Sequence, residues 1–115
     1  MIIYGVDTKK KVTPIMVRDA IIRCFSEAHK EVLKLMEECS KGMSEKDIER
    51  MKAIEIELIV KRCFDETGGD FNNPTKESLM KAIGKLAEFA AEFRQPEIIK
   101  KHYNEIKTLI DLLKD

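Results

Sequence analysis

Apolar residues recur every three or four positions along most of this chain, and the longest such segment lies between Thr13-Pro14 and Gly42. This spacing collects apolar side chains on one face of an α-helix, which must then be buried. Threonine caps free N–H groups and proline tolerates the first helical position, so together they indicate a helix start. The sequence therefore predicts a core-facing helix over residues 14–41, with an apolar stripe formed by Ile21, Cys24, Ala28, Val32, Leu35 and Cys39.

Three further segments with helical spacing follow, separated by turn-forming residues. Ser44 caps the second segment and Gly68-Gly69 ends it, while Pro74 and Pro96 begin the third and the fourth. Because short connections favour antiparallel neighbours, we expect an all-α fold: an antiparallel up-down-up-down four-helix bundle over residues 14–115. After the first helix, the predicted helices of this bundle cover residues 45–67, 74–94 and 96–114.

Residues 1–13 are expected to form a short extended N-terminal arm. The arm contains a short β-prone stretch, Ile2, Ile3, Tyr4 and Val6, followed by a charged turn. A single short strand cannot form a sheet alone. The stretch therefore packs on the bundle, pairs with a second copy across an edge, or stays loose. We adopt packing on the bundle as the expectation.

Charge and hydropathy narrow the possible partners. Lys+Arg and Asp+Glu number 21 each, so no net field attracts nucleic acid or an anionic membrane. The clusters Lys9-Lys10-Lys11 and Lys100-Lys101 have almost no aromatic residues among them, so weak RNA binding is kept only as an alternative. The uninterrupted apolar runs are much shorter than a membrane span, which predicts that the chain does not enter a membrane.

Three cysteines, Cys24, Cys39 and Cys63, form an odd set in a chain without a signal-peptide pattern. This usage is typical of reduced thiols and predicts a cytoplasmic protein. Cys24 and Cys63 fall at similar heights in the predicted bundle, so a disulfide or a soft metal site is one alternative. Buried, inert thiols are the preferred interpretation. The many Ile, Lys and Glu residues with a single glutamine also suit a thermophile.

The segment from Ala53 to Val60 carries more apolar residues than one helix face can bury. This surplus, together with the N-terminal stretch, predicts an interface for a homodimer or for a partner helix. Phosphate-binding and nucleophile motifs are lacking in the sequence. We therefore expect a helical protein-interaction module without catalytic activity. The predicted interface residues are Ile2, Ile3, Tyr4, Ile54, Ile56 and Val60.

Three ionisable residues, His29, Glu55 and His102, lie on or beside apolar stripes and fall in one middle layer of the predicted bundle. Two interpretations stay open. Imidazole and carboxylate groups in one layer suit a divalent metal such as Zn²⁺, Fe or Mn. In that case Glu105 would hydrogen-bond to a metal ligand without binding the metal itself. A hydrogen-bonded polar layer that fixes helix register is the preferred interpretation, and with it no cofactor is expected.

Overall fold

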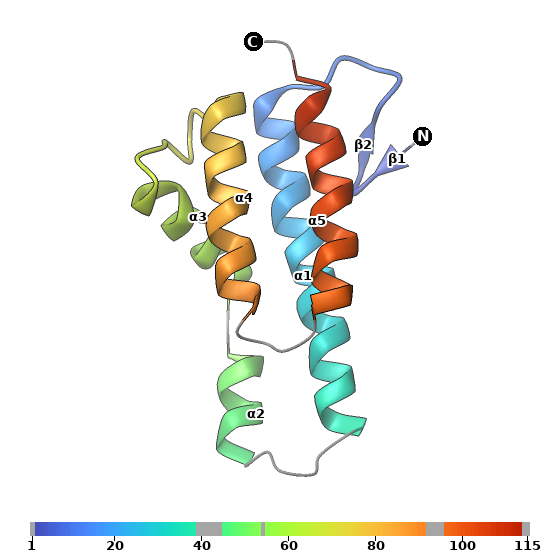
Figure 1. The fold of residues 1–115 in the computed structure, drawn as a ribbon, viewed down its shortest axis with the longest axis vertical. Coiled ribbons are helices and arrows are strands. Elements are labelled where there is room, and N and C mark those ends of the chain that lie inside the picture. The colour runs from blue at the N-terminus through green and yellow to red at the C-terminus, as the bar shows by residue number, and fades with distance from the viewer. Residues whose placement is uncertain (1, 39–44, 54, 92–95, 114–115) are drawn as a thin grey trace.

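The computed structural model describes residues 2–38, 45–53, 55–91 and 96–113 of the chain. Helices make up most of these residues, and a small two-stranded sheet precedes them (Figure 1). The predominantly helical character expected from the sequence is therefore confirmed. In chain order the elements are β1 (Ile2–Ile3), β2 (Val6–Asp7), α1 (Pro14–Glu38), α2 (Glu45–Lys52), α3 (Ile56–Glu66), α4 (Lys76–Ala91) and α5 (Pro96–Asp111).

The core lies where α1, α3, α4 and α5 meet. Helix α1 packs most extensively against α5, and α4 packs against both α3 and α5. The residues of the predicted α1 stripe whose side chains are described, Ile21, Cys24 and Ala28, are all buried. The side chains of Val32 and Leu35, and the whole of Cys39, lie outside the described residues. The largest fully buried side chains are Phe64, Ile21, Leu79, Ile83, Leu86, Ile106, Leu109 and Ile110.

The helix expected over residues 45–67 is interrupted, and this corrects the sequence prediction. Glu55 adopts an extended backbone conformation, with φ −98° and ψ 109°, and α3 begins after it. Apolar residues on more than one face cannot all point toward one side of a straight helix. The change of direction lets α3 turn Val60, Cys63 and Phe64 into the core. Helix α2 packs mainly on α1 and lies beyond the ends of α4 and α5 (Figure 1).

Helix α4 begins at Lys76, two residues after the proline that was expected to start it. Its start is fixed by two reciprocal hydrogen bonds. The backbone N–H of Ser78 donates to Thr75 Oγ1 at 3.1 Å, and the backbone N–H of Thr75 donates to Ser78 Oγ at 2.7 Å. This is the geometry of a capping box, with serine in the place of the usual glutamate. Asn73 donates its side-chain amide to Asp70 in the preceding loop at 3.2 Å.

The N-terminal arm is a β-hairpin that packs on the bundle. Strands β1 and β2 pair antiparallel, with Ile3 opposite Val6. Tyr4 and Gly5 form the turn and have φ values of 48° and 81°. A two-residue turn with both φ values positive matches the twist of a hairpin and usually contains glycine. Ile3 and Val6 are buried and belong to the core, so packing on the bundle is observed, although the stretch pairs with itself rather than lying as a single strand.

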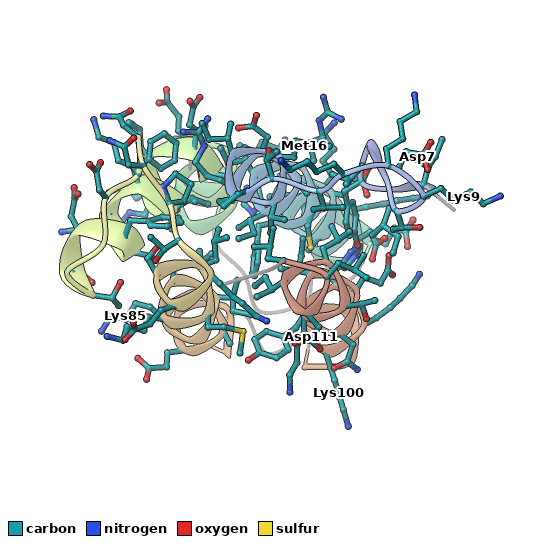
Figure 2. The ribbon with its side chains drawn as sticks, turned by 90° about the horizontal axis from the view of Figure 1, so that it is seen from above. Asp7, Lys9, Met16, Lys85, Lys100 and Asp111 are labelled. Carbon is teal, nitrogen blue, oxygen red and sulfur yellow. The ribbon has the colours of Figure 1, made fainter. Side chains whose placement is uncertain are left out.

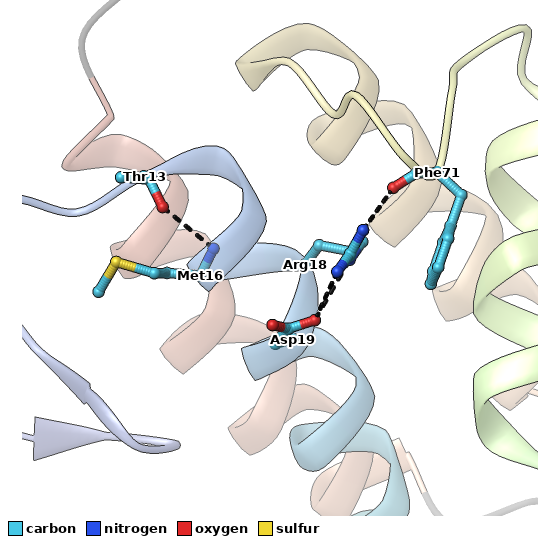
Figure 3. A network of polar contacts seen from close by, with 5 residues as sticks. All are labelled: Thr13, Met16, Arg18, Asp19 and Phe71. Atoms are coloured by element: carbon cyan, nitrogen blue, oxygen red, sulfur yellow. Dashed lines mark hydrogen bonds and ion pairs between the residues drawn. The ribbon is translucent and has the colours of Figure 1, made fainter.

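One side chain of α1 anchors the loop between α3 and α4 (Figure 3). Arg18 Nη1 donates a hydrogen bond to the carbonyl of Phe71 at 2.8 Å, and its guanidinium lies 4.5 Å from the centre of the Phe71 ring. That ring meets Phe64 edge to face. In the same view Thr13 Oγ1 accepts from the backbone N–H of Met16, which confirms threonine as the cap of α1. The loop is thus tied both to α1 and to the core.

Within the described residues, no helix combines the length and the apolar character that crossing a membrane requires.

Candidate functional site

Apart from the cysteines, His102 is the ionisable residue that the fold buries most deeply among those described, with 4% of its surface exposed. It comes from α5, and its Nδ1 atom is hydrogen-bonded to the hydroxyl group of Tyr4. The two rings lie 5.9 Å apart, tilted by 39°. Tyr4 belongs to the turn of the hairpin, so this contact joins the first and the last elements of the fold. It also explains why a histidine occupies an apolar stripe.

The other ring nitrogen of His102 faces Glu31 on α1. His102 Nε2 lies 3.6 Å from Glu31 Oε1, a separation too long for a hydrogen bond. Nε2 is buried and has no hydrogen-bond partner among the described residues. The Glu31 side chain is 47% exposed, whereas that of His102 is 5% exposed. One member of the pair, Glu31, is therefore in contact with solvent, and the other, His102, is buried.

Cys24 on α1 contacts the backbone of His102. Its thiol is fully buried and donates to the backbone carbonyl of His102 at 3.5 Å. Burial raises the pKa of the Cys24 thiol to about 12. A hydrogen bond between Cys24 and Tyr4 lowers this pKa, and Glu105 and Glu27 raise it further. Cys24 is therefore a neutral hydrogen-bond donor near pH 7 and not a nucleophile.

Tyr4 stays neutral for related reasons. Burial raises the pKa of its hydroxyl group, and Cys24 and Glu105, which also hydrogen-bond to it, raise the pKa further. The backbone carbonyl of Tyr4 accepts a hydrogen bond from Arg23 at 3.4 Å. A non-glycine residue at φ 48° is uncommon and strained by about 1–2 kcal/mol. The contacts to His102 and Arg23 hold the turn in this conformation.

A measurable consequence concerns thiol reactivity. We expect Cys24 to resist alkylation by iodoacetamide in the native protein, because the thiolate that reacts is scarce and the sulfur is buried. Labelling of the Cys24 peptide, quantified by mass spectrometry, should begin only at denaturant concentrations that unfold the chain. Rapid labelling of Cys24 under native conditions at pH 8 would contradict this placement.

The three residues predicted to form a metal layer have different surroundings. His102 is buried as expected, His29 is partly buried on α1, and Glu55 is exposed at the break between α2 and α3. In the part of the chain that the structure describes, no group of three or more His, Cys, Asp or Glu residues is placed to hold a metal ion. Metal binding by these three residues together therefore stays a prediction.

Sequence reasoning missed two neighbours of His102, Tyr4 and Glu31. Glu31 carries a usable signal, because it lies seven residues after Cys24 and seven residues return to the same face of a helix. Tyr4 carries none, since its contact with His102 spans 98 positions of the sequence.

Cys24 and Cys63 are both free and buried, in line with the preferred interpretation of inert thiols. Burial is also the main cause that raises the pKa of Cys63. These two cysteines form no disulfide with each other in this structure.

The predicted interface residues are divided between core and surface. Ile3 and Val60 are buried inside the subunit, so they stabilise the monomer itself and are not available to a partner. Ile56 and Tyr4 are partly buried against the core, Ile2 is 71% exposed, and Ile54 lies outside the described residues. The sequence list omitted Leu58, which is 60% exposed on α3.

The hairpin and α3 lie on opposite sides of the molecule (Figure 1). The view from above agrees, with Asp7 and Lys9 of the hairpin region at one edge and α3 at the other (Figure 2). A single patch cannot contain both Ile2 and Leu58. The two halves of the predicted interface are therefore two separate surfaces.

The lysine cluster of the sequence borders a cleft of about 610 Å³ between the hairpin–α1 connection and the end of α5. Lys9, Lys10 and Lys11 are exposed there, and the apolar side of the cleft contains Val12, Leu112 and Leu113. None of the residues that line it is aromatic. The cleft therefore adds no base-stacking surface to the alternative of RNA binding.

Comparisons with known proteins do not assign this arrangement to a family: no family model, no curated protein and no solved structure matches the chain.

Proposed function

We propose that the chain is a non-catalytic helical interaction module that forms a homodimer through the side of the molecule where α2 and α3 meet. The observation that carries this proposal is the exposure of Leu58 on α3, at 60%, next to Ile56 and Ile59, which are only partly buried. A large apolar side chain flanked by half-buried isoleucines is a surface that a partner covers favourably. We further propose that α1, α3, α4 and α5 form an up-down-up-down bundle in a cytoplasmic protein.

The protruding pair formed by α2 and the end of α1 supports self-association. Two helices cannot enclose a core, and the sequence places apolar residues along both of them. A second copy would bring two more helices and complete a local four-helix arrangement. The segment of residues 29–52 contains six basic and six acidic residues, so two copies do not repel each other.

A two-fold dimer uses the same patch on both subunits. The hairpin and α3 lie on opposite sides of the molecule (Figure 2), so contacts between the hairpin of one copy and α3 of the next would join unlike patches. Such contacts build rings or open chains rather than a two-fold dimer. We therefore assign the dimer to the α2–α3 side and not to Ile2.

Sedimentation equilibrium of the wild-type chain and of two matched variants tests this assignment. Leu58→Glu should shift the protein to a monomer, because two carboxylates would be buried in an apolar contact. Leu112→Glu, at a residue that is 45% exposed at the end of α5, should leave the dimer intact. Both side chains are exposed, so each change should alter the free energy of unfolding by no more than about 0.5 kcal/mol.

Two outcomes would contradict the proposal. One is a wild-type chain that remains monomeric over a wide concentration range. The other is equal weakening of the dimer by Leu58→Glu and by Leu112→Glu, since this would place the contact elsewhere.

A further inference from the structure

Among the described residues, the Nε2 atom of His102 is buried without a hydrogen-bond partner. A buried nitrogen without a hydrogen bond costs about 1–3 kcal/mol, and such atoms in native proteins often mark a water or an ion. His102 Nε2 has no partner among the described residues and points to the carboxylate of Glu31, which is open to solvent. We propose that His102 Nε2 and Glu31 Oε1 are the two protein ligands of a site for a transition-metal dication, Zn²⁺ or Cu²⁺, between α1 and α5.

The separation of the two atoms fits this role. Ligands that each lie about 2.0–2.1 Å from one Zn²⁺ ion, at tetrahedral or slightly wider angles, are roughly 3.3–3.6 Å apart. The square-planar angles that Cu²⁺ prefers need about 2.8–2.9 Å, which the half-exposed Glu31 side chain can reach by moving toward the imidazole. Nε2 and Oε1 are 3.6 Å apart, which is too long for a hydrogen bond but suits two ligands of one ion.

The hydrogen bonds on the other side of the ring favour a free lone pair at Nε2. The Tyr4 hydroxyl has one proton to donate, and Glu105 is a hydrogen-bond partner whose side chain can accept it. With that proton directed to Glu105, the Tyr4 oxygen accepts from Nδ1–H of His102. Nε2 is then an acceptor that faces a carboxylate, and a cation between the two removes their repulsion. Metal-binding histidines commonly donate their other ring N–H in this way.

The remaining coordination positions belong to water, since no third ligand is in place among the described side chains. Glu27 lies one helical turn before Glu31 and is exposed, so it can approach the ion from the same side. One imidazole and one carboxylate suit Zn²⁺ and Cu²⁺ better than Mg²⁺ or Ca²⁺, which prefer all-oxygen sites. The expected order of affinity is Cu²⁺ above Zn²⁺.

Binding of Cu²⁺ to the untagged full chain tests the site, with electron paramagnetic resonance as the readout. The wild type should bind one Cu²⁺ per chain and show coupling to a single imidazole. Glu31→Gln removes a direct ligand and should weaken the affinity by at least roughly 10–100-fold, the range found when the hydrogen-bond partners of metal ligands are changed. Glu31 is half-exposed, so this variant is expected to fold and carries the test even if His102→Gln does not.

The other histidine provides the matched control. His29→Gln should keep both the affinity and the imidazole signal, whereas His102→Gln should remove the signal in a chain whose circular dichroism remains helical. Loss of the signal in His29→Gln, or unchanged affinity in Glu31→Gln, would overturn the assignment. So would ¹⁵N chemical shifts that show Nε2 of His102 protonated at neutral pH and unaffected by one equivalent of Zn²⁺.

Discussion

Replacement of Phe64 by alanine is expected to lower the free energy of unfolding by about 3–5 kcal/mol, the largest effect that we predict for a single apolar side chain. Phe64 is fully buried on α3, and its ring meets Phe71, which Arg18 ties to α1. Removal of the ring leaves a cavity and also loosens the loop before α4. Urea denaturation followed by circular dichroism should show the midpoint falling by roughly 2 M, for an m-value near 2 kcal/mol/M.

Leu58 on the same helix is the control for this change. Leu58→Ala removes an apolar side chain that is 60% exposed, so the free energy of unfolding should change by no more than about 0.5 kcal/mol when the protein is dilute enough to be monomeric. Equal destabilisation by the two substitutions would mean that α3 does not face the core through Phe64.

Replacement of His102 by alanine is the second large effect, with an expected loss of about 2–4 kcal/mol. The change leaves a cavity between α1 and α5, and it deprives the Tyr4 hydroxyl of the partner that joins the hairpin to the bundle. Hydrogen exchange should show the amides of the hairpin losing protection before those of the helices. The denaturation midpoint measures the global loss.

Two smaller changes separate the contributions to this effect. Tyr4→Phe removes the hydroxyl alone and should lower the free energy of unfolding by about 1 kcal/mol. Lys101→Ala alters the exposed neighbour of His102 on α5 and should be neutral within about 0.5 kcal/mol. A neutral His102→Ala would show that the buried polar contact does not hold the hairpin.

The positions of most helices could be predicted because their signals are local. The stripe that includes Ile21 and Cys24 on α1 and the one that includes Ile106 and Leu109 on α5 recur at helical spacing, and all four residues are buried. Thr13 caps α1 as predicted from its place before Pro14. Period and capping depend on residues within one or two turns of each other, so the sequence records them directly.

The break at Glu55 was not predicted, because helix propensity alone permits a continuous helix there. The sequence did record the cause, since the surplus of apolar residues from Ala53 to Val60 cannot be buried on one face. The choice between a straight helix with an exposed face and a change of direction depends on where α1 and α4 offer space. That choice requires the packed structure.

The candidate site, too, was predicted only in part from the sequence. A histidine on an apolar stripe identified His102 as a buried polar residue from the sequence alone, and the structure buries it. Its neighbours were assigned by height in an idealised bundle, which suggested His29 and Glu55, whereas the folded chain brings Tyr4 and Glu31 to its ring. Height along a helix follows from the residue number, but the facing residue depends on helix rotation and crossing angle.

Local sequence patterns predict that this chain is mainly helical, which face of α1 is buried, and that His102 lies on an apolar helix face, because side-chain period and capping act over a few residues. The hairpin formed by the N-terminal stretch, and the contact of Tyr4 with His102 across 98 positions, are visible only in the folded chain. Such contacts depend on how rotated helices pack together, and no local pattern encodes that rotation.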